Sequence, residues 1–378
     1  MKYQTLILHN GNEIDKATGA LNIPIYQAST FNQEDVEIHQ KYTYARSENP
    51  TREALEKTVA SLESGKHGYA FSSGMAAISS AISAFIEQGD HIIATSDIYG
   101  GSYRILTQFF NKFGVTTTLV DTTDLNNIKD AIKPNTKLLF LETPSNPLLK
   151  VTDIVGCVEI AKKHNLITIL DNTFMSPYFQ RPIELGIDVV VHSATKFIGG
   201  HSDVIGGVTV VKNDEYAKKI YFVQNGFGAI LSPQDSFLLL RGIRTLKVRM
   251  EESQNSAIKI ANHLKTLDWI EEVYYPGLNS HKGHNILKTQ ASGFGGVLSF
   301  KTKNVEQVKR IMKNVKLWAV AVSLGGVESI LSYPARMSHY AIPKDQREKM
   351  GVTDNLLRLS VGLEDPDDLI NDLEDAIK

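Results

Sequence analysis

The chain of 378 residues is long enough to bury a large core and to form two domains. Its 42% hydrophobic and 22% charged residues are typical of a globular protein, and a formal net charge of -2 favours neither a nucleic acid nor an anionic membrane as partner. The single cysteine, Cys157, excludes an internal disulfide, and we find neither a signal peptide nor a membrane-spanning stretch. We therefore expect a cytoplasmic protein.

The first half of the chain predicts an arm followed by an α/β unit. Residues 1–50 show little periodicity and many turn formers, which predicts an extended arm, and residues 53–62 then have the pattern of an amphipathic helix. From residue 67 to 210 short apolar strands alternate with helices, which predicts a mostly parallel sheet covered on both faces. The expected strands are 68–71, 91–95, 116–120, 137–141, 166–170 and 187–191, and the expected helices are 75–86, 103–113, 125–132 and 155–164.

The rest of the chain predicts a smaller α+β unit. A helical stretch covers about residues 233–267, and Gly242 can interrupt it. Asp365 and Pro366 form a start signal for a last helix, 366–377. Strands are expected at 270–275, 296–301 and 356–361, and a helix at 305–313. We therefore divide the chain into an arm (1–50), a cofactor-binding α/β domain (51–240) and a C-terminal α+β domain (241–378).

A lysine follows one of the predicted buried strands. The apolar run 187–191 leads into a loop that carries Ser193, Thr195 and Lys196. Partial desolvation at such a place lowers the pKa of a lysine and makes its amine a nucleophile toward carbonyls, while nearby hydroxyls can bind a phosphate. Pyridoxal phosphate requires both functions, so this loop is our candidate cofactor anchor. The alternative is that Lys196, like most lysines, is a solvated surface charge.

Other polar residues lie where predicted strands end, the edge at which parallel sheets bind ligands. Asp171 can keep a pyridine nitrogen protonated, although an aspartate at a strand end is more often a turn or helix cap. The segment 72–75 leads from a strand into a helix and can form an anion site or a plain tight turn. Tyr99 can stack on a cofactor ring or pack in the core, and Asn146 can bind a ligand or belong to a turn between prolines.

The sequence gives less support to a serine hydrolase site, a nucleotide-binding P-loop or a metal site. Residues 193–196 match the S-x-x-K pattern of penicillin-recognising serine enzymes, but the chain lacks the S-D-N and K-T-G partners of that class. No P-loop pattern is present. His281 and His284 lie in a polar stretch without a third ligand, so we predict no metal site.

Ordered motifs run along nearly the whole chain. They are Pro24-Ile25-Tyr26-Gln27, Asn49-Pro50-Thr51-Arg52, Ser72-Ser73-Gly74-Met75, Glu142-Thr143-Pro144-Ser145-Asn146-Pro147, Asp171-Asn172-Thr173-Phe174, His192-Ser193-Ala194-Thr195-Lys196, Glu328-Ser329, Pro334 and Arg358-Leu359-Ser360-Val361-Gly362. With these motifs the chain resembles the cystathionine lyase and synthase family of transsulfuration, the enzymes of cysteine and methionine metabolism that use pyridoxal phosphate. The resemblance implies a type I aminotransferase-like fold and a homotetramer built from dimers that share active sites.

The resemblance also implies a role for each site residue. Lys196 would bind the cofactor as a Schiff base and move the substrate's α-proton, Asp171 would face the pyridine nitrogen and Tyr99 would stack on the ring. The residues implied to hold the phosphate are Gly74, Met75, Ser193 and Thr195, joined by Tyr44 and Arg46 of the neighbouring subunit. The residues implied to bind the substrate's α-carboxylate are Asn146, Ser323 and Arg358.

The predicted reaction depends on the residue before Ser323. Relatives that act at the γ-carbon of cystathionine usually carry glutamate there, whereas this chain has Val322 and so resembles the bacterial cystathionine β-lyases. Methionine γ-lyases are also apolar at this position but typically carry cysteine where this chain has Gly101. We predict β-elimination of L-cystathionine to homocysteine, pyruvate and ammonia. The alternatives are a cystathionine γ-lyase or γ-synthase, a serine hydrolase of S-x-x-K type and a non-catalytic binding protein on the same fold.

Overall fold

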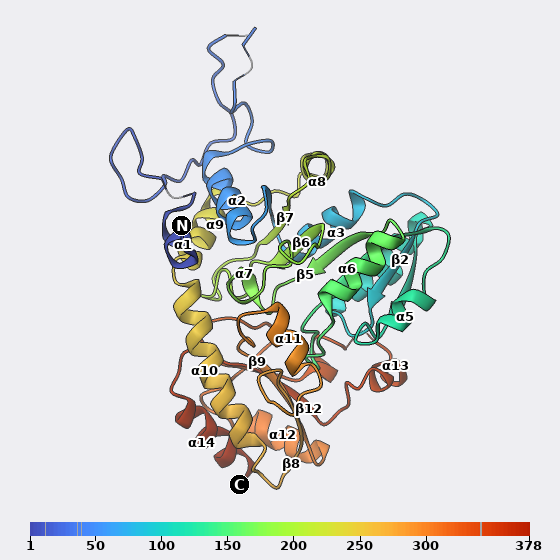
Figure 1. The fold of residues 1–378 in the computed structure, drawn as a ribbon. Helices are drawn as coiled ribbons and strands as arrows, with labels where there is room; N and C mark the ends of the chain where they lie inside the picture. The colour runs from blue at the N-terminus through green and yellow to red at the C-terminus, as the bar shows by residue number, and fades with distance from the viewer. Residues whose placement is uncertain (12, 36, 39, 341) are drawn as a thin grey trace.

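The computed structural model describes residues 1–11, 13–35, 37–38, 40–340 and 342–378. Its strands form two sheets, one of seven strands and one of five. Figure 1 shows the larger sheet with its helices in the upper part of the molecule and the smaller one below, with the long helix α10 (Leu246–Leu264) along one side. The predicted α/β fold with a second, smaller α+β part is confirmed.

The larger sheet has the order β1-β7-β6-β5-β4-β2-β3. Strands β6, β5, β4, β2 and β3 pair in parallel, and β7 is antiparallel to both of its neighbours. The central strands are rich in valine, isoleucine and leucine and are buried along their length, as expected for a sheet covered on both faces. The strands are β1 (His67–Phe71), β2 (His91–Thr95), β3 (Thr116–Val120), β4 (Thr136–Glu142), β5 (Ile167–Asp171), β6 (Val189–Ser193) and β7 (Gly207–Val211).

Helices on the two faces of this sheet bury two separate hydrophobic cores. One core includes residues of α2 and α6 together with Val190 and Val208, and the other includes residues of α3 and α8 together with Val189 and Val191. Alternate residues of β6 therefore serve opposite cores, as strand geometry requires. The helices of this part are α2 (Pro50–Leu62), α3 (Gly74–Ser83), α4 (Gly100–Arg104), α5 (Leu125–Asp130), α6 (Ile154–Lys163), α7 (Ser176–Phe179), α8 (Asp214–Phe227) and α9 (Pro233–Ile243).

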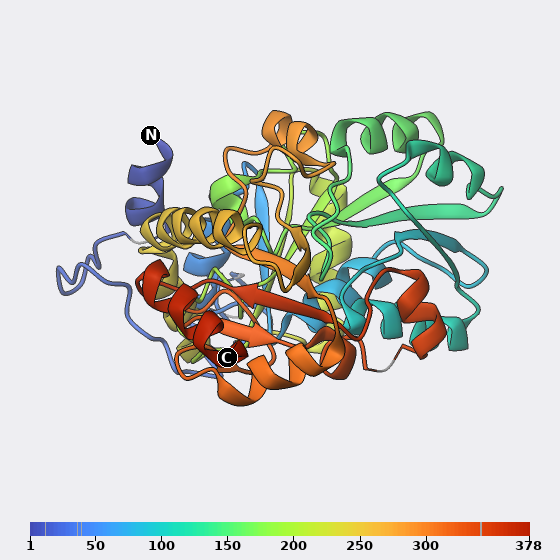
Figure 2. The same ribbon diagram turned by 90° about the horizontal axis from the view of Figure 1, so that it is seen from below.

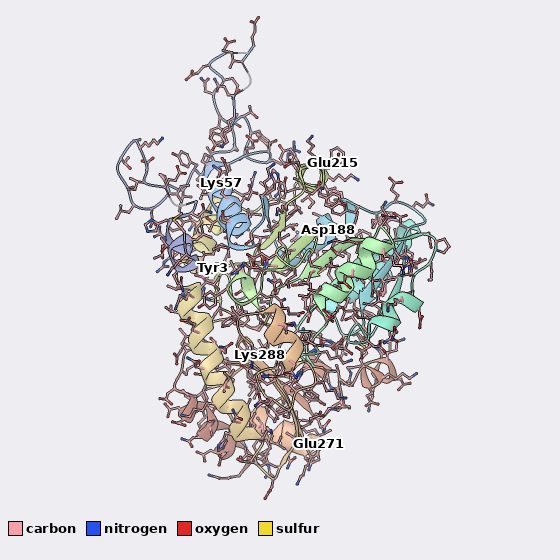
Figure 3. The ribbon with its side chains drawn as sticks, in the orientation of Figure 1. Tyr3, Lys57, Asp188, Glu215, Glu271 and Lys288 are labelled. Carbon is pink, nitrogen blue, oxygen red and sulfur yellow. The ribbon has the colours of Figure 1, made fainter. Side chains whose placement is uncertain are left out.

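Polar contacts fix the register of the strands that carry the site. Asp188, labelled in Figure 3, precedes β6 and accepts hydrogen bonds from the amide and the hydroxyl of Thr168 on β5, at 2.9 and 2.8 Å. These bonds join the amino ends of β5 and β6. At the other end of the same strands, Asp171 and Val191 are paired neighbours. The carboxyl ends of β5 and β6, which are expected to carry chemistry, are thus held level.

The smaller sheet has the order β10-β11-β12-β9-β8 and packs against α10, α12 and α14 around a third hydrophobic core. Figure 2 shows α12 and α14 on the outer side of this sheet. The predicted long helical stretch is broken at Arg244 and Thr245, between α9 and α10. The remaining elements are β8 (Ile270–Tyr274), α11 (His284–Gln290), β9 (Val297–Thr302), α12 (Val305–Asn314), β10 (Ala319–Val320), β11 (Ile330–Ser332), α13 (Lys344–Lys349), β12 (Leu356–Ser360) and α14 (Pro366–Ile377).

The N-terminal arm differs in part from the expected extended segment. It begins with the helix α1 (Tyr3–His9), whose buried Ile7 packs into the core beside α2. Beyond α1 the described residues run as loops, and Figure 1 shows them projecting from the body of the molecule above α2. An isolated bridge between Thr30 and Tyr44 closes part of this projection. Among the described residues, no helix is both long and apolar enough to cross a membrane.

Candidate active site

A cavity of about 420 Å³ lies where the carboxyl ends of β4, β5 and β6 meet loops of the smaller sheet. Every predicted site residue except Tyr44 and Arg46 lines it. From the larger sheet and its helices come Gly74, Met75, Tyr99, Asn146, Asp171, Ser193, Thr195 and Lys196, and from the C-terminal part come Ser323 and Arg358. Residues separated by more than two hundred positions in the sequence therefore surround one space.

Lys196 lies three residues after the end of β6, where its side chain is largely buried. Its Nζ atom donates a hydrogen bond of 2.6 Å to Oγ of Ser323. Burial, together with the positive charge of Arg358, lowers the pKa of Lys196 to about 8. An amine with this pKa is a far better nucleophile and base near neutral pH than an exposed lysine, so the site can form a bond to a carbonyl.

Two buried carboxyl groups, Asp171 and Glu142, are paired neighbours at the carboxyl ends of β5 and β4. Burial raises the pKa of both. The amide and hydroxyl of Thr173 donate hydrogen bonds of 3.0 and 2.5 Å to Oδ1 of Asp171 and hold its pKa down, whereas the charge of Asp171 raises the pKa of Glu142 further. Asp171 is therefore the carboxyl that stays ionised more readily, as a partner of a cationic ring nitrogen must.

The start of α3 lines the part of the cavity next to the end of β6. Ser73 is its N-cap, and its Oγ atom accepts a hydrogen bond of 3.0 Å from the amide of Ala76. The first amides of the helix have no intrahelical acceptor and can bind an anion. A Cβ atom added at Gly74 would lie 2.7 Å from Cβ of Ser193, so glycine lets the helix start approach β6 closely. Thr195 also lines this part of the cavity, with its hydroxyl bonded to the backbone of Gly206.

Arg358 on β12 is buried and points into the cavity with its guanidinium fixed. It donates hydrogen bonds of 2.9 Å to Oδ1 of Asn146, 2.5 Å to the carbonyl of Ser323 and 3.2 Å to Oγ of Ser332. Burial lowers the pKa of Arg358 to about 10, and its Nε atom has no hydrogen-bond partner. A fixed, incompletely paired guanidinium beside an amide suits a carboxylate ligand.

Ser323 adopts a backbone conformation that serine rarely takes. Its φ angle is +89°, in the region that favours glycine. This conformation places its carbonyl on Arg358 and its hydroxyl on Lys196. One residue therefore links the candidate nucleophile to the candidate carboxylate site, and strain of this kind is often retained at functional sites.

Tyr99 follows β2 and is held at its backbone, where its amide donates a hydrogen bond of 2.8 Å to Oε2 of Glu142. Its ring is 40% exposed and faces the cavity. A Cβ atom added at Gly101 would lie 2.4 Å from this ring and 2.7 Å from the sulfur of Met75. Glycine at position 101 thus leaves room for the Tyr99 ring and the Met75 side chain in the cavity wall.

Tyr44 and Arg46 lie outside the cavity. Arg46 donates hydrogen bonds of 2.8 and 3.3 Å to the carbonyl and side-chain oxygens of Asn225 on α8, and its guanidinium lies over the ring of Tyr44 at 5.7 Å. Tyr44 is 46% exposed. Both side chains are on the projecting arm, and their predicted role in a neighbouring subunit stays a prediction.

Several lining residues were not predicted as site residues. Glu142 and Thr173 lie inside motifs that the sequence already displays, and their positions next to a strand end were the signal that could have identified them. The others come from α4, from the end of the short strand β11 and from loops, and the sequence pattern identified none of them as site residues. They include Arg104, Ile205, Ser332, Met337 and Ser338.

The residues present fit pyridoxal phosphate. The cavity joins a desolvated amine, a buried carboxylate and a helix N-terminus with adjacent hydroxyls, which are the groups needed for an aldehyde, a ring nitrogen and a phosphate. The contact between Gly74 and Ser193 leaves no room for a larger residue on the phosphate side. Among the described residues, no group of three or more His, Cys, Asp and Glu side chains is arranged to hold a metal ion.

Comparison with known proteins identifies the same cofactor. Residues 4–378 match the model of the Cys/Met metabolism PLP-dependent enzymes. The chain is 52% identical over 375 residues to cystathionine beta-lyase MetC of Bacillus subtilis (strain 168), covering 99% of this chain and 96% of the relative. It is 50% identical over 378 residues to cystathionine gamma-lyase of the same organism, covering 100% of both chains.

Solved structures show the same fold. The crystal structure of cystathionine gamma-lyase from Lactobacillus plantarum complexed with L-serine is 45% identical, with a TM-score of 0.96 and coverage of 100% of this chain and 98% of that chain. The structure of metB from Corynebacterium glutamicum is 43% identical, with a TM-score of 0.97 and the same coverage. Together with the match along residues 4–378, these similarities show that the chain belongs to the pyridoxal-phosphate-dependent enzymes of cysteine and methionine metabolism.

Proposed function

We propose that this protein is a cystathionine β-lyase, which cleaves L-cystathionine to homocysteine, pyruvate and ammonia in methionine biosynthesis. The observation that carries the choice of reaction is Val322. It lines the cavity next to Ser323, is 63% exposed, and offers the substrate an apolar side chain where relatives that act at the γ-carbon of cystathionine usually carry glutamate.

Each step is assigned to a residue of the chain. Bound pyridoxal phosphate supplies an electron sink for the negative charge that develops at the substrate's α-carbon. Lys196 would hold the cofactor, and its amine, when free, would take the α-proton of the substrate. Asn146 and Arg358 hold the substrate's carboxylate and thereby direct the α-hydrogen toward Lys196. Asp171 would face the ring nitrogen, while Ser193, Thr195 and the start of α3 would hold the phosphate.

The distinction between β- and γ-elimination rests on proton transfer. Loss of sulfur from the β-carbon requires only the α-proton to be removed first, whereas loss from the γ-carbon also requires a proton to leave the β-carbon. Among the described residues that line the cavity, the carboxyl groups are Glu142 and Asp171, and both lie at the strand ends. Val322 adds no carboxylate beside Ser323, where relatives that act at the γ-carbon of cystathionine usually carry glutamate, and this difference favours β-elimination of cystathionine.

A cystathionine γ-lyase or γ-synthase is the second candidate, because relatives named as β-lyase and as γ-lyase are almost equally similar to this chain. A reaction of the methionine γ-lyase type is less favoured. Gly101 occupies the position where those enzymes typically carry cysteine, and a larger residue would press on the Tyr99 ring and Met75.

The thiol released from L-cystathionine tests the proposed reaction. We expect the purified enzyme, supplied with pyridoxal phosphate, to release homocysteine, measured by chromatography of the derivatised thiols. Cysteine as the main thiol would contradict β-elimination and favour the γ-lyase. The same assay with Ser193→Ala and Lys196→Ala tests the class of enzyme. Activity that is lost in Ser193→Ala but survives removal of pyridoxal phosphate would favour an S-x-x-K hydrolase, and cofactor binding without any turnover would favour a binding protein.

We also propose that the enzyme is a cytoplasmic homo-oligomer, a tetramer built from dimers that share active sites. The support for sharing is the position of Tyr44 and Arg46. The arm holds both side chains in defined contacts outside the chain's own cavity, and the exposed Tyr44 ring is free to meet another subunit.

A further inference from the structure

A buried pair, Asp97 and Ser145, lies behind the cavity without lining it. Asp97 is in the loop after β2, two residues before Tyr99, and Ser145 is in the loop after β4, directly before Asn146. Strands β2 and β4 are neighbours, so their loops leave the sheet side by side. The pair thus joins the loop of a predicted ring-stacking residue to the loop of a predicted carboxylate-binding residue.

The contact between the two loops is a hydrogen bond from Oγ of Ser145 to Oδ2 of Asp97. Both residues are almost fully buried, with 0% of Ser145 and 1% of Asp97 exposed. The same hydroxyl accepts a hydrogen bond of 3.1 Å from the amide of Lys150, and the amide of Ser145 donates one of 2.9 Å to the carbonyl of Lys150. The Ser145 side chain is therefore held from two sides and has one orientation.

Burial of the Asp97 carboxylate lowers the stability of the fold. Its Oδ1 atom has no hydrogen-bond partner, and burial raises the pKa of Asp97 to about 6 despite the nearby charge of Lys150. Lys150 itself pairs with Asp121, at 3.0 Å. A buried, incompletely paired carboxylate lowers stability, and groups of this kind are often retained because they have a functional role. The hydrogen bond from Ser145 indicates that the role of Asp97 is positioning.

We propose that Asp97 and Ser145 are positioning residues for the substrate's α-carboxylate. By fixing Ser145, Asp97 fixes the neighbouring Asn146, whose Oδ1 atom receives the Arg358 guanidinium at 2.9 Å. Because the oxygen of the Asn146 side chain accepts this bond, its NH₂ group is left to donate a hydrogen bond to an anion. This inference rests on the proposed function only in so far as the substrate is an α-amino acid.

Binding of simple ligands to the holoenzyme tests the proposal. Asp97→Ala, Ser145→Ala and the double variant are titrated with L-alanine and with ethylamine, an amine that lacks a carboxylate, and binding is followed by the visible absorption of the cofactor. We expect each single variant to bind L-alanine about tenfold more weakly, the effect of losing one charge-assisted hydrogen bond, and to bind ethylamine as the wild type does. Because both variants remove the same bond, the double variant should be no weaker than the weaker single variant.

Kinetics and a control variant complete the test. KM for L-cystathionine should rise about as much as the affinity for L-alanine falls, with kcat changed less than about threefold, because uniform binding is lost. Asp121→Asn removes the exposed neighbouring carboxylate and should behave as the wild type. Unchanged L-alanine affinity in Ser145→Ala, equal weakening for ethylamine, or additive losses in the double variant would overturn the proposal. The alanine and ethylamine titrations decide it even if L-cystathionine is not the substrate.

Discussion

Lys196 shows how burial and function are linked at the scale of a single residue. The fold places its amine next to Arg358 and away from water, and its pKa falls to about 8 as a result. At neutral pH the cofactor-free protein must therefore either carry a poorly solvated charge or release a proton. The sequence predicted the desolvation from the position of Lys196 behind an apolar strand, but not the second cause, because Arg358 is 162 positions away along the chain.

Replacing Lys196 by methionine should stabilise the cofactor-free protein at pH 7. The folded pKa of Lys196 is lower than the unfolded value near 10.5, so between pH 8 and 10.5 the unfolded state binds more protons and stability rises with pH. Below pH 8 the full penalty applies, at most about 3 to 4 kcal/mol for a pKa lowered from 10.5 to about 8. Urea unfolding of the wild type and of Lys196→Met, at pH 7 and at pH 10, measures the difference in the free energy of unfolding. A gain of equal size at the two pH values would contradict this explanation.

At the scale of elements, the sequence predicted the strands of the larger sheet better than its helices. The expected strands 91–95 and 116–120 and the last helix have the bounds that the structure shows, because their apolar patterns and caps are clear. The helix α8 was not predicted, and its exposed Phe222 and Phe227 explain why, since aromatic residues on the solvent face blur the amphipathic period. The expected helix 103–113 is instead α4 followed by a π turn and a 3-10 turn.

The N-cap residue of α2, Asn49, also forms a hydrogen bond to the arm. Oδ1 of Asn49 accepts hydrogen bonds from the amides of Thr51 and Arg52, while its Nδ2 atom donates a bond of 2.8 Å to the carbonyl of Tyr26. Asn49→Ala should lower the free energy of unfolding by about 1 to 2 kcal/mol, because both functions are lost. Asn49→Asp keeps the cap acceptor and loses only the donor, so it should cost less. Urea unfolding of the three proteins measures this order, and equal losses for both variants would contradict the cap.

At the scale of the whole molecule, the site depends on contacts that no local pattern encodes. Motifs predicted the residues at the strand ends, because each follows a recognisable strand. Loops of the C-terminal part contribute Val322, Ser338 and Ser323, whose backbone has a positive φ angle. Only the packing of the two sheets against each other brings these residues to the cavity. The division of the chain at residues 50 and 240 stays a prediction, as do the roles of the individual site residues.

The arm allows the shared site to be tested by mixing subunits. Arg46→Ala and Lys196→Ala subunits should each be inactive alone, because one lacks the arm's cation and the other lacks the nucleophile. If Arg46 completes the site of a neighbouring subunit, mixed oligomers contain some sites with both residues intact and should regain a measurable fraction of wild-type activity. Co-expression with two different affinity tags isolates the mixed oligomers. Activity no higher than that of the parent variants would count against sharing.

The central claim is that Lys196 holds the cofactor at the edge where β4, β5 and β6 end. Borohydride reduction of the holoenzyme fixes pyridoxal phosphate on the lysine that holds it, and digestion followed by mass spectrometry identifies that lysine. We expect the phosphopyridoxyl group on Lys196, in the peptide that follows Ser193. Its recovery on any other lysine, or the absence of a labelled peptide from protein that retains the cofactor's absorption, would contradict it.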